Sequence, residues 1–116
     1  MKRDAGPYVI ASGQSLGPAI SLDSVRLAAI QMPAAWTAAN LTFQGSVDGT
    51  NFFDVFDGVA AGAEVTVGAA ASRYIILNPD VFSQFSSVKI RSGTSGAAVA
   101  QGAARTLQLV TIPLGW

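Results

Sequence analysis

The sequence predicts an all-β fold, an antiparallel, jelly-roll-like β-sandwich of about eight or nine strands. Residues 41–47 alternate in polarity, with Leu41, Phe43 and Val47 on one face, as in a strand with one buried side. The pair Asp48-Gly49 follows directly and suits a tight hairpin turn, because both residue types tolerate positive φ. Turn signals then recur about every 8–12 residues, a spacing typical of sandwiches and barrels.

The N-terminal half begins with a short polar arm over residues 1–7. The strands expected after it cover residues 7–11, 19–22 and 25–32. Pro33 ends the last of these strands and biases Met32 toward an extended conformation. The alanine-rich connection 33–40 can form one helical turn, with Pro33 at its first position.

The strands expected in the remaining chain cover residues 41–47, 52–56, 63–67, 73–77, 87–92 and 105–112. The segment 73–77 is almost continuously apolar, so both of its faces are expected to be buried. Residues 80–85 suit one short helical turn, and the Gly-, Ala- and Ser-rich run 93–104 is expected to be a long exposed loop. One sandwich domain over residues 8–112 is therefore expected, followed by a tail over residues 113–116.

The composition points to a protein that contacts neighbours. Half of the residues are hydrophobic, and 12% are charged, about half the usual share of a soluble domain. Seven basic and seven acidic residues cancel, so little charge repulsion opposes association of the chains. We expect a homo-oligomer, although an Ala- and Gly-rich chain from a high-GC genome would have a similar composition. Without a basic excess we expect no nucleic-acid partner.

Targeting and membrane signals are also absent from the sequence. No apolar core of a signal peptide follows Met1-Lys2-Arg3-Asp4. No segment approaches the roughly 20 apolar residues that span a bilayer. We therefore expect a chain that is made in a cytoplasm and has no membrane partner.

Reactive groups are scarce, so we expect no enzyme, no cofactor and no metal. The chain has no histidine and no cysteine, which removes the Ser-His-Asp triad, thiolate chemistry and the commonest metal ligands. Glu64 is the single glutamate and alternates with valines, so we expect it to face solvent. Asp48, Asp54 and Asp57 could together offer oxygen ligands to Ca²⁺. We favour the alternative that they bond the backbone of their own turns.

Aromatic and terminal residues supply the candidate interface, which consists of Tyr8, Phe53, Leu114 and Trp116. Adjacent residues of a strand point to opposite faces, so Phe52 and Phe53 cannot share one core. We expect Phe52 in the core and Phe53 in an interface. Burial of Trp116 against a neighbour could supply about 1.5–3 kcal/mol or more; the alternative is a frayed tail.

Part of the chain resembles the discoidin-like, galactose-binding jelly roll found in many carbohydrate-binding modules. The resemblance covers roughly residues 24–92 and is carried by Leu27–Met32, Trp36, Leu41–Val47 with Ser46-Val47-Asp48-Gly49, Phe52-Phe53 and Arg73-Tyr74-Ile75. The resemblance implies a jelly-roll β-sandwich fold. The ligand loops of that family vary, so no binding residue is carried over, and exposed aromatics would be the sugar platform.

Nearly the whole chain resembles small head- or tail-associated proteins of tailed bacteriophages and gene-transfer particles. Three pieces carry the resemblance: Met32–Gln44, Ala71–Leu77 and Val88–Thr94. It implies a virion component made in the bacterial host cytoplasm and displayed on the particle surface. The role that we favour is a capsid decoration (cement) protein that binds the major capsid protein. The alternative is a carbohydrate-binding head spike or tail module that contacts host polysaccharide.

Overall fold

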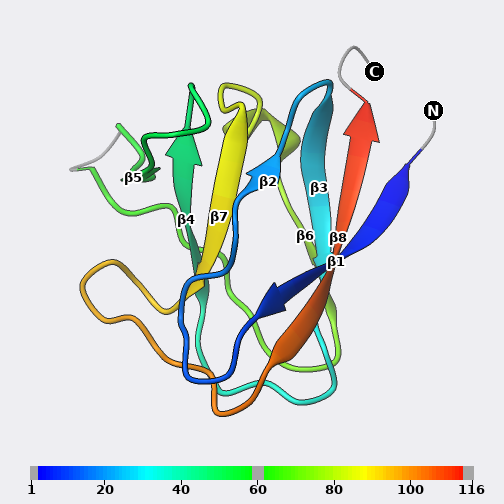
Figure 1. Ribbon diagram of the computed structural model, residues 1–116, viewed down its shortest axis with the longest axis vertical. Helices are drawn as coiled ribbons and strands as arrows, with labels where there is room; N and C mark the ends of the chain where they lie inside the picture. The colour runs from blue at the N-terminus through cyan, green and yellow to red at the C-terminus, as the bar shows by residue number, and fades with distance from the viewer. Residues whose placement is uncertain (1–2, 59–61, 114–116) are drawn as a thin grey trace.

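Two four-stranded antiparallel sheets face each other in the computed structural model, which describes residues 3–58 and 62–113 (Figure 1). The elements are β1 (Asp4–Ile10), β2 (Ile20–Ser21), β3 (Val25–Gln31), β4 (Leu41–Ser46), β5 (Phe53–Asp54), β6 (Tyr74–Ile76), the 3-10 helix η1 (Pro79–Val81), β7 (Ser87–Ser92) and β8 (Arg105–Pro113). The first sheet has the order β1-β8-β3-β6 and the second the order β2-β7-β4-β5.

The connections between these strands follow a jelly-roll path. Only β4 and β5 are consecutive strands that pair with each other; every other connection crosses from one sheet to the other. Each sheet therefore holds strands distant in sequence, as in two interlocked Greek keys. The fold class expected from the sequence is confirmed.

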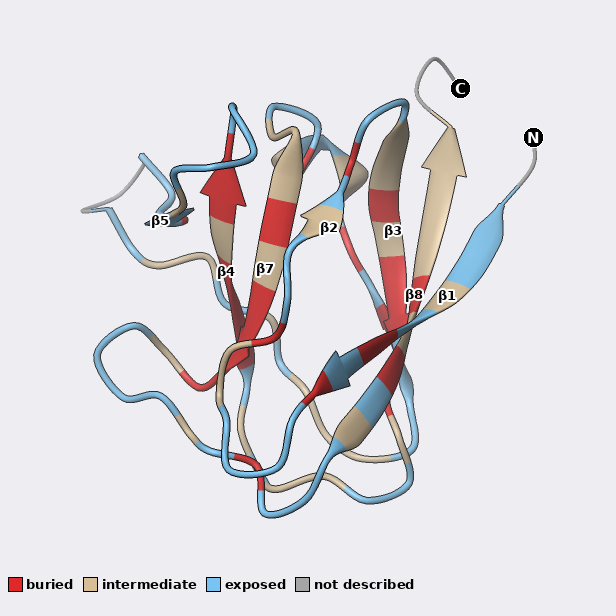
Figure 2. Cartoon of the chain, in the orientation of Figure 1, coloured by how far each residue is buried: buried red, intermediate tan, exposed pale blue. Residues whose placement is uncertain are grey.

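The hydrophobic core lies between the sheets. Leu41 and Phe43 of β4 face Leu27 and Ile30 of β3 across it, and all four are fully buried. The Phe43 ring meets the Phe82 ring edge-on, with 4.9 Å between centroids, a favoured aromatic geometry. In Figure 2 the buried residues lie along β3, β4 and β7, and exposed residues fill most of the connections.

The first strand begins earlier than the sequence predicts. Asp4–Pro7 pair with residues 108–111 of β8, so most of the described part of the expected arm belongs to the sheet. Pro7 has no N–H to donate, but β1 is an edge strand that pairs only with β8. An edge strand tolerates proline because one side of its ladder is free.

The segment 63–67 does not form the expected strand. It makes two isolated bridges, Phe56 to Glu64 and Leu41 to Val67. These bridges hold the segment against the end of β5 and the start of β4, so it covers the sheet edge without extending it.

The run 93–104 is more ordered than the expected exposed loop. Thr94 and Ala97 exchange backbone hydrogen bonds at its tip. Gln101 is 1% exposed, and its side-chain amide bonds both the backbone N–H and the carbonyl of Thr37. This amide pairing fastens the end of the loop to the connection between β3 and β4.

Candidate functional site

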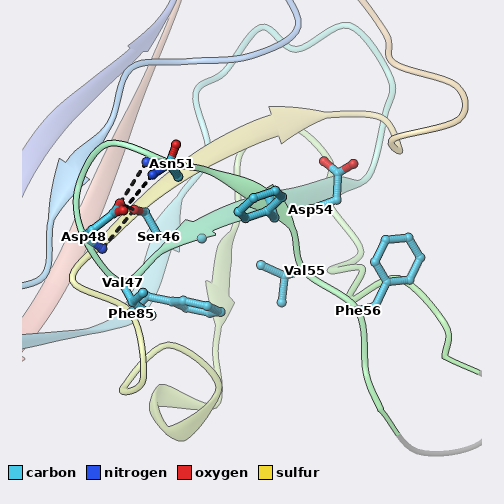
Figure 3. Close-up of a pocket in the computed structure, with 10 residues that line it drawn as sticks. Ser46, Val47, Asp48, Asn51, Asp54, Val55, Phe56 and Phe85 are labelled. Carbon is cyan, nitrogen blue, oxygen red and sulfur yellow. Dashed lines mark hydrogen bonds between the residues drawn. The ribbon is translucent and has the colours of Figure 1, made fainter.

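An apolar hollow of about 460 Å³ opens beside β5 (Figure 3). Its volume lies in the range of sites that accept small ligands or side chains. The apolar part of its lining comes from Val47, Phe53, Val55, Phe56 and Phe85. We call this feature the β5 hollow.

Strand pairing sets the direction of Phe53 in the β5 hollow. Phe53 lies opposite Gly45 of β4, and directly opposite residues of a sheet share a face. Gly45 continues the inward row of Leu41 and Phe43, which are both fully buried. Phe53 therefore points to the core side of the sheet, yet it is 74% exposed. At this open edge of the sandwich the described chain leaves the ring uncovered.

Gly45 allows the floor of the β5 hollow to form. A Cβ atom at this position would lie 2.5 Å from the Phe85 ring, so only glycine lets the ring approach the backbone so closely. Phe85 follows η1, about 30 residues beyond β5 in the sequence. In Figure 3 the Phe85 and Phe56 rings lie on either side of Val55, which is buried.

Phe52 and Phe53 are arranged differently from the expectation. The expected core position of Phe52 is wrong: its side chain is half-buried and lies under Lys89, with the Nζ atom 4.4 Å from the ring centroid. This is a cation–π contact. The register places Phe53, not Phe52, on the core side, and β5 begins only at Phe53.

Asp48 shapes the turn at one end of the β5 hollow. Its Oδ1 atom accepts hydrogen bonds from the backbone N–H groups of Thr50 and Asn51, both at 2.8 Å, and Oδ2 accepts one from the Asn51 side chain (Figure 3). The N–H of Asn51, then that of Thr50, holds the pKa of this carboxyl far below its usual range. Asp48 is thus a charged turn residue whose two oxygens are used within the turn.

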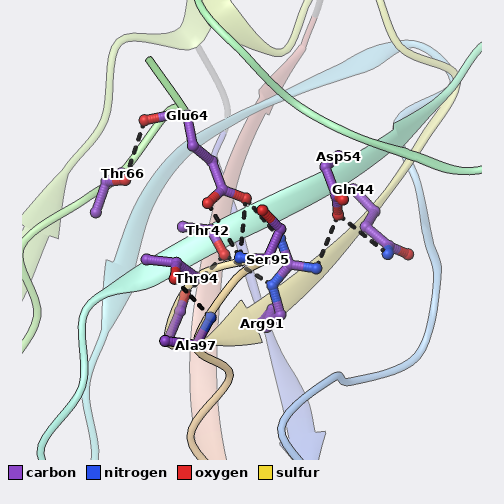
Figure 4. A network of polar contacts seen from close by, with 10 residues as sticks. Thr42, Gln44, Asp54, Glu64, Thr66, Arg91, Thr94, Ser95 and Ala97 are labelled. Atoms are coloured by element: carbon purple, nitrogen blue, oxygen red, sulfur yellow. Dashed lines mark hydrogen bonds and ion pairs between the residues drawn. The ribbon is translucent and has the colours of Figure 1, made fainter.

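Arg91 links the segments around the β5 hollow through two ion pairs and a hydrogen bond (Figure 4). The side chain is 8% exposed and contacts Asp54 at 2.8 Å and Glu64 at 2.7 Å. Its Nε also donates to Thr42 Oγ1 at 3.0 Å. The Arg91 guanidinium lowers the pKa of the Asp54 carboxyl. We call these four residues the Arg91 network.

Glu64 does not face solvent as expected from its alternation with valines. Its side chain is only 11% exposed and also accepts a hydrogen bond from the backbone N–H of Ser95 at 3.0 Å. Because Glu64 bridges to Phe56 and Asp54 follows Phe53, the Arg91 network fixes the strand segments that carry both rings.

The three aspartates weighed as calcium ligands are held apart by other partners. Asp48 bonds its own turn, Asp54 bonds Arg91 and Gln44, and the backbone N–H of Asp57 donates to Ala63. Within residues 3–58 and 62–113 no group of three or more His, Cys, Asp or Glu side chains is placed to hold a metal ion.

Tyr8 was expected in an interface, but the structure places it in the core. It is 2% exposed, and its hydroxyl donates to the Pro18 carbonyl at 2.7 Å and accepts from the Ile90 N–H at 2.9 Å. Burial raises the pKa of Tyr8 to about 12. A side chain so enclosed offers no surface to a partner. The other two expected interface residues, Leu114 and Trp116, lie outside the described residues.

A second exposed apolar surface lies on β6 and was missed in the sequence. Tyr74 is 65% and Ile76 is 81% exposed, whereas burial of both faces was expected. β6 is an edge strand paired only with β3, and Tyr74 and Ile76 share the face turned away from the core residue Ile75. We call Arg73, Tyr74 and Ile76 the β6 patch.

Comparison of the chain with protein-family models, with curated proteins and with solved structures finds no match. In the described part of the chain, no helix combines the length and the apolar character needed to cross a membrane. The site itself offers uncovered aromatic surface held by a frame of ion pairs and hydrogen bonds.

Proposed function

We propose that this protein is a virion structural subunit, carried in many copies on the outer surface of a capsid, where it decorates the shell and stabilises it. The observation that carries the proposal is Phe53, an aromatic side chain on the core side of a sheet that stays 74% exposed. Within the described residues nothing covers this ring, and another surface that fills the β5 hollow would cover it. The resemblance to phage head- and tail-associated proteins supports the same role.

Burial of apolar area would drive both attachment to the shell and contact between neighbouring subunits on it. Each large apolar side chain that becomes covered contributes about 1.5–3 kcal/mol. The Arg91 network and the Asp48 turn hold the hollow in shape beforehand, so less ordering free energy is lost on contact. Repetition over a symmetric shell turns many modest contacts into a large total.

The copy number per particle tests this role. We would purify particles made by the genome that encodes this chain and quantify the subunit against the major capsid protein by mass spectrometry. A decoration protein is expected at a number comparable to that of the capsid subunits. A handful of copies would contradict shell decoration and indicate a tail, portal or vertex position.

A carbohydrate-binding head spike or tail module is the second candidate. Phe53 and Phe56 are exposed rings beside polar Asp48 and Asn51, and aromatic faces can stack on sugars. We rank it second because the Asp48 carboxylate and the Asn51 amide bond each other, leaving fewer polar groups for sugar hydroxyls. Binding of the isolated chain to purified host polysaccharide, lost in Phe53→Ser, would favour this candidate.

A further inference from the structure

We propose that the β5 hollow of one copy receives the β6 patch of a second copy of this chain. The inference rests on the proposed function in one respect: a subunit present in many copies on a shell meets its own kind at close range. It names a lateral partner for the hollow, and it can be tested on the isolated protein.

The β5 hollow needs an occupant that is apolar and carries a positive charge. Its walls are aromatic and aliphatic, and its lining includes the acidic residues Asp48 and Asp54 but no basic residue. Hydrogen bonds from its turn keep Asp48 ionised at neutral pH. Asp54 shares the single charge of Arg91 with Glu64, so these three residues together carry a net negative charge.

The β6 patch has this chemistry on the same chain. Tyr74 and Ile76 project from the outer face of an edge strand, and Arg73 next to them is exposed. An exposed apolar pair with an exposed arginine next in the sequence matches an apolar hollow with an acidic rim. Chains without net charge face no overall repulsion as they approach.

Repeated from copy to copy, a contact of this kind would cover most of the uncovered apolar surface of each chain. The described residues include six exposed large hydrophobics, namely Val9, Val47, Phe53, Phe56, Tyr74 and Ile76. Five of the six belong to the β5 hollow or to the β6 patch, and only Val9 lies elsewhere. Further copies of this chain therefore supply the partners for both surfaces, because each contact buries the hollow of one copy and the patch of the next.

The contact is expected to be weak in solution. A contact between a three-residue strand and one hollow buries less surface than the roughly 800 Å² that each partner buries in a standard interface. Association should therefore require high protein concentrations in solution, whereas neighbouring copies on a shell have effective concentrations in the millimolar range.

Sedimentation equilibrium of the isolated chain, up to about 1 mM, tests the inference with three variants. Phe53→Ser changes the hollow, Ile76→Ser changes the patch, and Val9→Ser is the matched control at an exposed apolar site outside both. Each of the first two is expected to raise the dissociation constant at least about tenfold, and the control is expected to leave it unchanged. Circular dichroism verifies the fold, and Phe56→Ser replaces Phe53→Ser if that variant does not fold.

Mixing the two interface variants gives the sharpest result. The Phe53→Ser chain keeps its β6 patch and the Ile76→Ser chain keeps its β5 hollow, so an equimolar mixture regains one intact contact and should associate more strongly than either variant alone. Absence of association in the wild-type protein, an unchanged constant in either variant, or no gain on mixing would each overturn the inference. None of these results bears on the copy number per particle, which tests the proposed function separately.

Discussion

Tyr8 illustrates how a single residue connects the two sheets. It belongs to β1 of the first sheet, and its hydroxyl bonds the backbone of Ile90 in β7 of the second. Tyr8→Phe would leave this N–H and the Pro18 carbonyl without their partner. We expect the free energy of unfolding to fall by about 1–3 kcal/mol, as measured by chemical denaturation. An unchanged stability would contradict this role.

The same hydroxyl predicts a loss of stability in alkali. Burial raises the pKa of Tyr8 from 10.0 to about 12, so the folded chain holds this proton more tightly than the unfolded chain. The stabilisation that the protonated Tyr8 hydroxyl contributes to the folded state is fully present below pH 10 and is lost as the pH rises toward 12. Thermal melts across this range should show a smaller decline for Tyr8→Phe than for the wild type. Equal declines would exclude Tyr8 as the cause.

At the scale of elements, the Arg91 network fastens β5 and the segment 63–67 to the sheet. Glu64→Gln removes one charge beside a nearly buried guanidinium, and we expect a loss of about 1–3 kcal/mol. Asp54→Asn should cost less, because the Asp54 side chain is 34% exposed and solvent weakens its ion pair. Denaturant unfolding of both variants shows which of them loses more stability. A larger loss for Asp54→Asn than for Glu64→Gln would contradict this prediction.

Acid should also weaken this network. Arg91 lowers the pKa of Asp54 in the folded state, so the stabilisation is present above the unfolded pKa of about 3.9 and is lost as the pH falls below it. In Asp54→Asn this part of the acid sensitivity should disappear, which thermal melts between neutral and acidic pH can measure.

Gly45 is the element-scale determinant of the β5 hollow. In Gly45→Ala the new methyl group would overlap the Phe85 ring, which must move and take the floor of the hollow with it. We expect a loss of about 1–3 kcal/mol from overpacking, measured by thermal unfolding. A Gly6→Ala variant is the control, since a Cβ there meets nothing within 4 Å. Equal stability of the two variants would contradict the close approach of Phe85.

The sequence predicts the central strands and the short edge strand β2 well, but it misjudges the length of β1 and β5 and the exposure of β6. β3, β4, β7 and β8 each have two neighbours and start where the alternation of side chains places them. β1, β5 and β6 lie at edges, where local patterning says less about length or cover. The exposure of Ile76 follows from the order of strands in the sheet, which no local pattern encodes.

The candidate site was only partly predictable for the same reason. The adjacent aromatics at positions 52 and 53 signalled that one ring would lie outside the core. Their directions depend on the pairing of Phe53 with Gly45, and the hollow depends on the approach of Phe85 from about 40 residues away. The sequence gave no local signal that the Glu64 side chain would be largely enclosed, because its partners Arg91 and Ser95 come from a distant segment.

At the scale of the whole molecule, the two sheets leave apolar surface uncovered at β5 and β6, while the remaining exposed residues are mostly small or polar. Grouped exposed apolar residues of this kind are typical of surfaces that contact another molecule. We therefore propose that this chain acts through contact between its surface and that of other subunits.

Rebinding to particles tests that claim most directly. Particles stripped of the subunit would be incubated with the wild type, Phe53→Ser or Val9→Ser, and the melting temperature of the shell would be measured by calorimetry. The account predicts that the wild type and Val9→Ser restore a higher melting temperature, whereas Phe53→Ser does not. A shell that melts at the same temperature with and without the wild-type protein would contradict it.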